Sequence, residues 1–170
     1  ISPESISDDN YFKLKLANEN YYTLPSSNNF IFINNQLGVA DTFNSKKLKT
    51  INTFSLGGLN FKGFNYRGIG PKENNYYLGG NKFFTSTVGY GSSFIFDEKD
   101  NVNIKLFTTI GSLWDSDYTN DNEFDLRAST GLSFDILTAV GPISLTYAVP
   151  IDKIDNDSTK RFNFSIGTSF

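Results

Sequence analysis

The alternation of apolar and polar residues from Phe124 to Ile136 constrains the fold more than any other feature of the chain. This period of two places the two kinds of side chain on opposite faces of a β-strand, whereas a helix would scatter the charges around its circumference. The run of roughly 13 residues is about twice the length of a typical strand in a soluble protein. The even positions are Phe124, Leu126, Ala128, Thr130, Leu132, Phe134 and Ile136, and the odd positions are Asp125, Arg127, Ser129, Gly131, Ser133 and Asp135.

The same period recurs along the rest of the chain. The further segments that carry it begin near Phe12 or cover Phe30–Ala40, about 83–96, Val102–Trp114, Ile143–Ile151 and Phe162–Phe170. None has the spacing of an amphipathic helix. The sequence therefore predicts an all-β fold with roughly seven strands.

The connections between these segments alternate in length. Pro25–Asn29, Asp97–Asn101 and Ala139–Pro142 are short, while Asp41–Gly79, Asp115–Glu123 and Asp152–Lys160 are longer and rich in Asn and Asp. Short turns at one end and long loops at the other, joining long two-faced strands, are typical of a transmembrane antiparallel β-barrel. A soluble β-sandwich or lipocalin-like barrel stays open as the alternative. The Lys, Arg, Asp and Ser residues opposite the apolar faces favour a wet lumen over a dry core.

Composition limits the chemistry. The chain contains no His and no Cys, which excludes Ser-His-Asp and Cys-His nucleophile systems and His/Cys zinc sites within it. A net charge of −3 gives no reason to expect a nucleic-acid partner. The acidic residues of Asp115–Glu123 lack the spacing of an EF-hand. We interpret them, together with Asp152, Asp155 and Asp157, as solvated loop residues, and we expect no enzyme activity, cofactor or metal site.

The number of strands indicates whether these residues could form a closed barrel by themselves. Bacterial single-chain barrels have even numbers of strands, and the unpaired edges of a seven-stranded sheet could not face lipid. Residues 1–170 are therefore expected to be the C-terminal part of a larger barrel.

Several motifs resemble a known family. The last nine residues, Phe162–Phe170, resemble the C-terminal signal of bacterial outer-membrane proteins. Gly57–Phe64, Gly68–Lys72 and Gly79–Asn81 together resemble the sixth extracellular loop of the BamA/surface-antigen family. Further motifs follow in the order of that family: Gly111–Asp115, similar to its strand-13 motif, then Gly141–Ile143, Tyr147–Pro150 and Arg161–Phe164.

The resemblance implies a 16-stranded barrel of which this chain supplies strands 10 to 16. Members of the family fold and insert other β-barrel proteins in the bacterial outer membrane, without a cofactor. The partners implied are unfolded outer-membrane proteins, outer-membrane lipids and, through domains outside this chain, accessory lipoproteins. A TamA-type assembly module, a two-partner-secretion transporter and a passive porin remain as alternatives.

The resemblance also implies a functional loop. It places the tip of the loop 41–79 inside the barrel, with the motif Lys62, Gly63 and Phe64 held by Trp114 and Asp115 of the strand-13 motif. The family has Arg where this chain has Lys62, and Lys keeps the charge but loses the planar fork. Gly63 is expected to adopt a positive φ or to allow close approach of the backbone. Phe64 is expected to pack on the inner wall.

The final strand is the second site that the resemblance implies. In the family it closes the barrel against the first strand through a weak seam. Gly167 fits weak pairing, because Gly loses more entropy on ordering and packs nothing. An edge that opens could pair with an incoming strand. The seam residues expected here are Phe162, Phe164, Ile166, Gly167 and Phe170.

Overall fold

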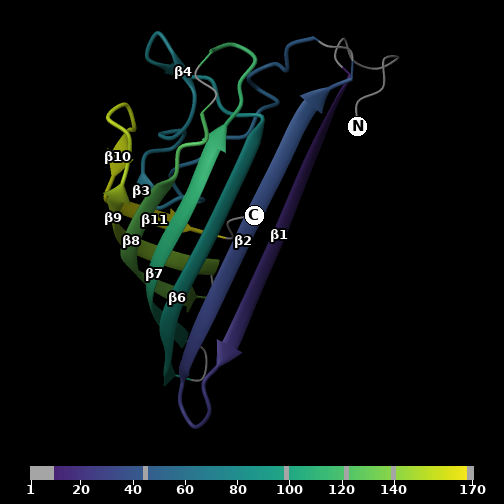
Figure 1. Cartoon of the computed structure of the whole chain (residues 1–170). Helices are drawn as coiled ribbons and strands as arrows, with labels where there is room; N and C mark the ends of the chain where they lie inside the picture. Colours follow the sequence, from purple (N-terminus) through teal and green to yellow (C-terminus); the bar gives the residue numbers. More distant parts are fainter. Residues whose placement is uncertain (1–9, 44–45, 98–99, 121–122, 139–140, 168–170) are drawn as a thin grey trace.

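A computed structural model describes residues 10–43, 46–97, 100–120, 123–138 and 141–167 (Figure 1). Seven strands form one antiparallel sheet in the order β1-β2-β6-β7-β8-β9-β11. Their bounds are β1 Tyr11–Thr23, β2 Asn29–Thr42, β6 Lys82–Asp97, β7 Asp100–Trp114, β8 Arg127–Thr138, β9 Gly141–Asp152 and β11 Phe162–Ile166. The expected all-β fold of about seven strands is confirmed.

Two short ribbons lie outside the main sheet. β3 (Gly63–Phe64) pairs with β10 (Thr159–Lys160), and β4 (Lys72–Glu73) pairs with β5 (Tyr76–Tyr77). Among the described residues, no helix is long and apolar enough to cross a membrane.

The sheet has an apolar outer face, formed by a row of large side chains. Side chains in register on five neighbouring strands, β6, β7, β8, β9 and β11, are each 45–58% exposed. They are Tyr90, Leu106, Leu132, Tyr147 and Phe162. A continuous apolar band of this kind would be unfavourable in water but suits the hydrocarbon core of a bilayer.

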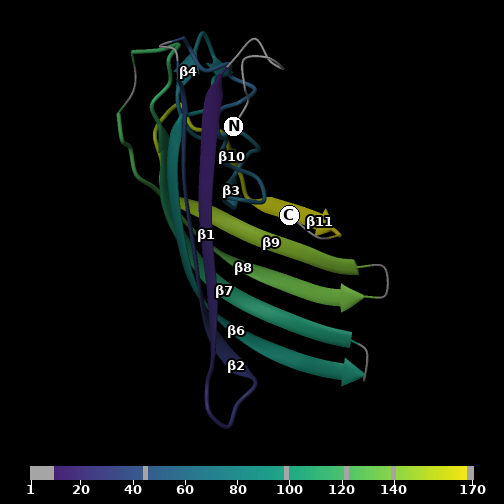
Figure 2. The ribbon, with the colours of Figure 1, turned by 90° about the vertical axis from the view of Figure 1, so that its right-hand side faces the viewer.

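The opposite, inner face carries polar and small side chains together with some buried apolar ones, and the loop that joins β2 to β6 packs against it. In β8 the odd-numbered Arg127, Ser129 and Ser133 are buried, while the even-numbered Leu132 is exposed. The predicted alternation is therefore confirmed, although β8 begins at Arg127 and not at Phe124. Figure 2 shows the sheet curved around the segment that contains β3, so the loop occupies the concave side.

Adjacent residues in the middle of β2 test this division of the faces. Leu37 is 47% exposed on the outer face, whereas Gln36 borders the inner cavity described below. Near the bilayer midplane, Leu37→Arg is expected to cost about 2–4 kcal/mol of unfolding free energy, because a charge would enter the hydrocarbon. The matched change Gln36→Arg is expected to cost much less. Chemical unfolding of the barrel in vesicles measures both, and equal losses would contradict the assignment of the faces.

Candidate functional site

The loop between β2 and β6 carries its own apolar core against the inner face. Leu56 and Ile69 form a bridge within the loop, and Phe54 forms another with Gly80. The core combines loop residues with strand residues of β2, β6 and β7, all at most 8% exposed. Its members are Ala40, Leu48, Phe54, Leu56, Phe61, Phe64, Ile69, Phe83 and Leu113. Burial of this many apolar groups holds the loop against the sheet.

The loop motif contacts β8 of the inner face. Gly63 has φ +98°, the positive value that was expected, and a Cβ there would lie 3.0 Å from Cβ of Ser129. The hydroxyl of Ser129 donates a hydrogen bond to the Lys62 carbonyl oxygen at 2.7 Å. Phe64 is fully buried and meets Phe61 edge to face, with 5.2 Å between ring centroids. The backbone of the motif is thus fixed on β8, while the Phe64 side chain packs within the core of the loop.

Substitution of Gly63 tests this docking. Gly63→Ala is expected to weaken loop docking by about 1–3 kcal/mol, because a residue with a Cβ is strained at positive φ and its methyl would press on Ser129. Gly58→Asn is the control, because φ is +70° there, Asn tolerates that region and a Cβ would make only ordinary contacts. Faster proteolysis of the loop in the Gly63 variant alone is the expected result, and equal resistance in both variants would contradict the docking.

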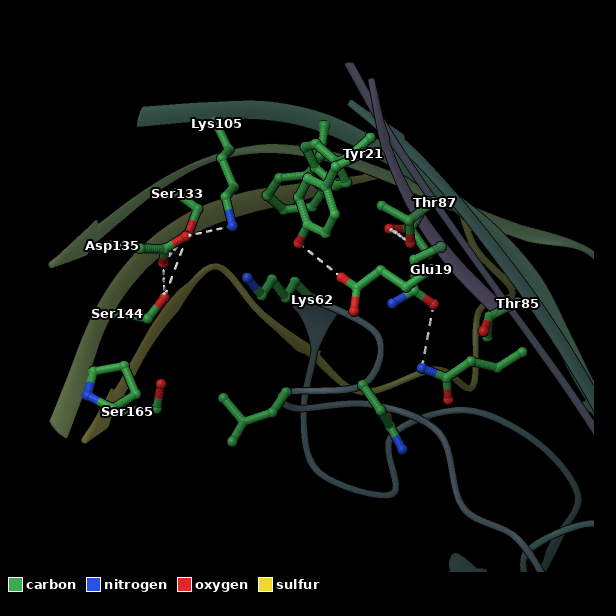
Figure 3. A pocket seen from close by; sticks show the side chains of 18 of the residues that line it. Glu19, Tyr21, Lys62, Thr85, Thr87, Lys105, Ser133, Asp135, Ser144 and Ser165 are labelled. Atoms are coloured by element: carbon green, nitrogen blue, oxygen red, sulfur yellow. Dashed lines mark hydrogen bonds and ion pairs between the residues drawn. The ribbon is translucent and has the colours of Figure 1, made fainter. Parts of the chain in front are cut away.

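Lys62 points into a polar cavity of about 380 Å³ on the inner face. Its ammonium lies 5.2 Å from the ring centroid of Phe107 on β7, a cation–π distance. Figure 3 shows the amine among Lys105, Asp135 and Tyr21. Burial lowers the pKa of Lys62, Asp135 opposes this shift by raising it, and Lys105 lowers it further.

Asp135 balances the two lysines of the cavity. Lys105 forms an ion pair with it at 3.1 Å, and the hydroxyls of Ser133 and Ser144 donate hydrogen bonds to it. The cavity also reaches Ser165 and Gly167 at the terminal strand. One polar space therefore connects Lys62 of the loop motif to Ser165 and Gly167.

The structure corrects the predicted partner of Lys62. Asp115 pairs with Lys82 at 2.8 Å, and Trp114 meets Phe124 edge to face at 4.8 Å. Phe107, whose ring faces the Lys62 ammonium, lies seven residues before Trp114 on β7. At the rise per residue of a β-strand, the two residues are roughly 24 Å apart. The predicted contact between Lys62 and Asp115 is therefore wrong, because the loop tip reaches deeper along β7 than the Trp114-Asp115 motif.

The sequence contained one signal for the actual partner. Phe107 is an aromatic residue in the polar phase of its strand, between Lys105 and Thr109. Its side chain is buried on the inner face, where its ring lies over Gly131 of β8. A Cβ added at Gly131 would lie only 2.8 Å from Phe107 Cζ. Large aromatic residues that break a polar face can mark the place where a loop docks.

The acidic loops are only partly solvated. Asp117 accepts hydrogen bonds from the Leu48 backbone N–H at 2.6 Å and from Asn81 Nδ2 at 3.1 Å. Asp157 was expected to be solvated, but its side chain is only 3% exposed and pairs with Arg127. That expectation was wrong for both residues, since both act as structural acceptors. Over the ranges that the structure describes, no group of three or more His, Cys, Asp or Glu residues could hold a metal ion.

The terminal strand is paired on one side within the described residues. β11 pairs with β9 from Phe162↔Tyr147 to Ile166↔Ile143. Phe162, Phe164 and Ile166 are 54–62% exposed on the outer face. Gly167 follows with φ +95°, and no atom lies within 4 Å of the position a Cβ would take. Phe170, the last predicted seam residue, lies outside the described residues.

Comparisons with known proteins agree with this architecture. Residues 4–170 match the Omp85 superfamily domain. The outer membrane protein assembly factor BamA of Neisseria meningitidis serogroup B is 27% identical over 182 residues, which cover 86% of this chain. The chain spans only 22% of the length of that relative.

The solved structures give the same fold. The crystal structure of BamA from Haemophilus ducreyi lacking POTRA domains 1–3 matches with a TM-score of 0.82 and 22% sequence identity, over 92% of this chain and 35% of that one. Fold and family together place the chain in the bacterial outer membrane, as part of a transmembrane β-barrel. With its family domain matched over residues 4–170, this chain belongs to the Omp85 superfamily.

Proposed function

We propose that residues 1–170 form strands 10 to 16 of a 16-stranded barrel that folds and inserts other β-barrel proteins in the outer membrane. The observation that carries the proposal is the terminal strand β11, Phe162–Ile166, which pairs only with β9 within the described residues and is followed by Gly167 at a positive φ. The family and the BamA relatives support the same role. The seam would lie between β11 and the first strand of the complete barrel.

The edge of β11 supplies the working surface in this proposal. Its backbone N–H and C=O groups on the side away from β9, which have no strand partner among the described residues, would pair with the C-terminal strand of an incoming protein, as in β-augmentation. Phe162, Phe164 and Ile166 would anchor β11 in lipid, while the polar cavity behind it keeps the inner side wet. The new barrel would leave when its own first and last strands pair.

The proposed role needs strand exchange and no bond chemistry, so we expect neither enzyme activity nor a cofactor. The partners expected are unfolded outer-membrane proteins and outer-membrane lipids. Accessory lipoproteins would bind domains outside these residues. The Lys62, Gly63 and Phe64 motif is proposed to hold the loop inside the barrel, against Phe107 and Ser129.

A reconstitution experiment tests the proposal. Vesicles containing the full-length protein should fold an added outer-membrane barrel protein faster than empty vesicles or vesicles with an unrelated porin. Gel-shift assays of heat-modifiable folding measure the rates. Equal rates in all three vesicles would contradict the proposal. Solute efflux at the rate of the porin vesicles would favour a passive pore instead.

The related alternatives differ in the protein they handle. A two-partner-secretion transporter should move one dedicated exported protein across the vesicle membrane, and a TamA-type module should assist a narrow set of barrels. Folding of several unrelated barrels would support the general insertase.

A further inference from the structure

We propose that Arg127 and Asp157 are positioning residues that fix the start of the terminal strand by clamping residues 153–160 onto the docked loop. This inference rests on the proposed function. It assigns a role to two residues that belong neither to the loop motif nor to the seam. We call the pair and the segment that it holds the clamp.

The first part of the clamp is a direct connection between the loop motif and the chain just before β11. Lys160 pairs with Gly63 and Thr159 pairs with Phe64 in the β3–β10 ribbon. Only Arg161 separates this ribbon from β11. The two functional segments, nearly 100 residues apart in sequence, are thus neighbours in one hydrogen-bonded unit.

The contact continues beyond the ribbon. The Asn65 backbone N–H donates to Ser158 O at 2.9 Å, and the Ser158 N–H donates to Gly68 O at 2.9 Å. The side-chain amide of Asn65 donates to Ser158 Oγ at 2.7 Å. Gly68 is essential to this approach, because a Cβ there would lie 2.4 Å from Ser158 O. The two segments are therefore in contact through their backbones.

Arg127 and Asp157 close the clamp from the barrel wall. Arg127 Nε and Nη2 donate to the two oxygens of Asp157 at 3.1 and 3.3 Å, a bidentate pair whose side chains are 5% and 3% exposed. Arg127 also donates to Asp125 O at 2.7 Å, and the Ile154 N–H donates to Asp157 Oδ2 at 2.9 Å. A buried fork of this kind fixes both the distance and the angle between β8 and residues 153–160.

The consequence for the terminal strand is an asymmetry between its ends. At its start, the clamp ties residues 157–160 to both the loop and β8. At its finish, Gly167 keeps one backbone hydrogen bond to Pro142 O, and its missing side chain leaves open space. The terminal strand is thus held at its start, so an incoming strand meets an edge whose register is already fixed.

The test uses a disulfide that replaces the clamp. Asn65→Cys with Ser158→Cys would join the two segments where their side chains already touch. The disruptive variants are Arg127→Lys, which keeps the charge but loses the fork, and Gly68→Ala, which presses on Ser158 from the loop side. Each is made in the full-length protein, alone and with the cysteine pair, and assayed for folding of an added barrel protein in vesicles.

Both disruptive variants should stay folded and lose assembly rate by about tenfold. Oxidation of the 65–158 cysteine pair should return the rate to within about twofold of the unmodified protein, and reductant should remove the gain. The control lock is Thr108→Cys with Thr130→Cys between β7 and β8, where the hydroxyls are 3.2 Å apart on the exposed side. It should add stability without restoring the rate.

Three results would overturn the inference. They are full activity of both disruptive variants, a formed 65–158 disulfide that restores nothing, and equal restoration by the control lock, which would mean a general stability effect. A failure of the proposed function is distinguishable, because then the unmodified protein also lacks assembly activity. In that case the rate at which the 65–158 disulfide forms still measures how closely the clamp holds the two segments together. This rate should fall in the Arg127→Lys variant. An unchanged rate would overturn the inference.

Discussion

Arg127→Ala is expected to lower the free energy of unfolding of the barrel by about 3–5 kcal/mol, because it leaves the buried carboxylate of Asp157 without its partner. Both side chains are at most 5% exposed, so water cannot replace the lost hydrogen bonds. Removal of both partners should cost less than the sum of the two single changes, since no unpaired charge then remains. Urea unfolding in vesicles, followed by tryptophan fluorescence, measures these values.

Arg161→Ala is the matched control, because its side chain is exposed at the same end of the barrel. Its expected effect is within about 0.5 kcal/mol. A loss below 1 kcal/mol for Arg127→Ala, or strict additivity in the double variant, would mean that the pair does not hold residues 153–160 on β8.

A disulfide across the seam should have the largest effect on activity. Cysteines placed in β11 and in the first strand of the full-length barrel, at disulfide-compatible spacing, should lock the edge against an incoming strand. The oxidised protein should remain folded and lose at least about 90% of its assembly rate, a tenfold change, and reductant should restore it.

The control for the seam lock joins two strands that need not separate. Phe134→Cys and Leu145→Cys are register partners on β8 and β9, on the outer face. This lock should leave the rate unchanged. Full activity with a completely oxidised seam would refute opening, while the fold would stand.

The strands could be predicted from the sequence because lipid and lumen impose opposite requirements on alternate residues. Leu132 and Ser133 show the rule, one exposed on the outer face and the other buried on the inner face. The ends of the strands were less predictable. The alternation continues from Phe124, but pairing of β8 with β7 begins only at Arg127. Periodicity reports which face a residue would take, and it does not report where the hydrogen bonds begin.

The candidate site could be predicted only in part. The positive φ of Gly63 follows from the Lys-Gly-Phe motif, which the structure places on the inner face. Lys62 meets Phe107, and Asp157 meets Arg127, through contacts between segments that are 45 and 30 residues apart. Nothing local in the sequence separates Asp157 from its solvated neighbours, since its burial depends on how the loops fold together. Long-range contacts of this kind need the three-dimensional arrangement.

The most direct test of the account is to find out which strand edge an incoming barrel protein meets. A photoreactive residue at Ser165 of β11, in the full-length protein, should cross-link to the C-terminal strand of a substrate during folding in vesicles. The same residue at Leu16 of β1, which is exposed, should not, because β1 would be paired with its preceding strand in the complete barrel. Cross-links from Ser165 alone are the predicted result. Equal cross-linking from both positions, or none from Ser165 while the substrate folds, would contradict insertion at the terminal strand.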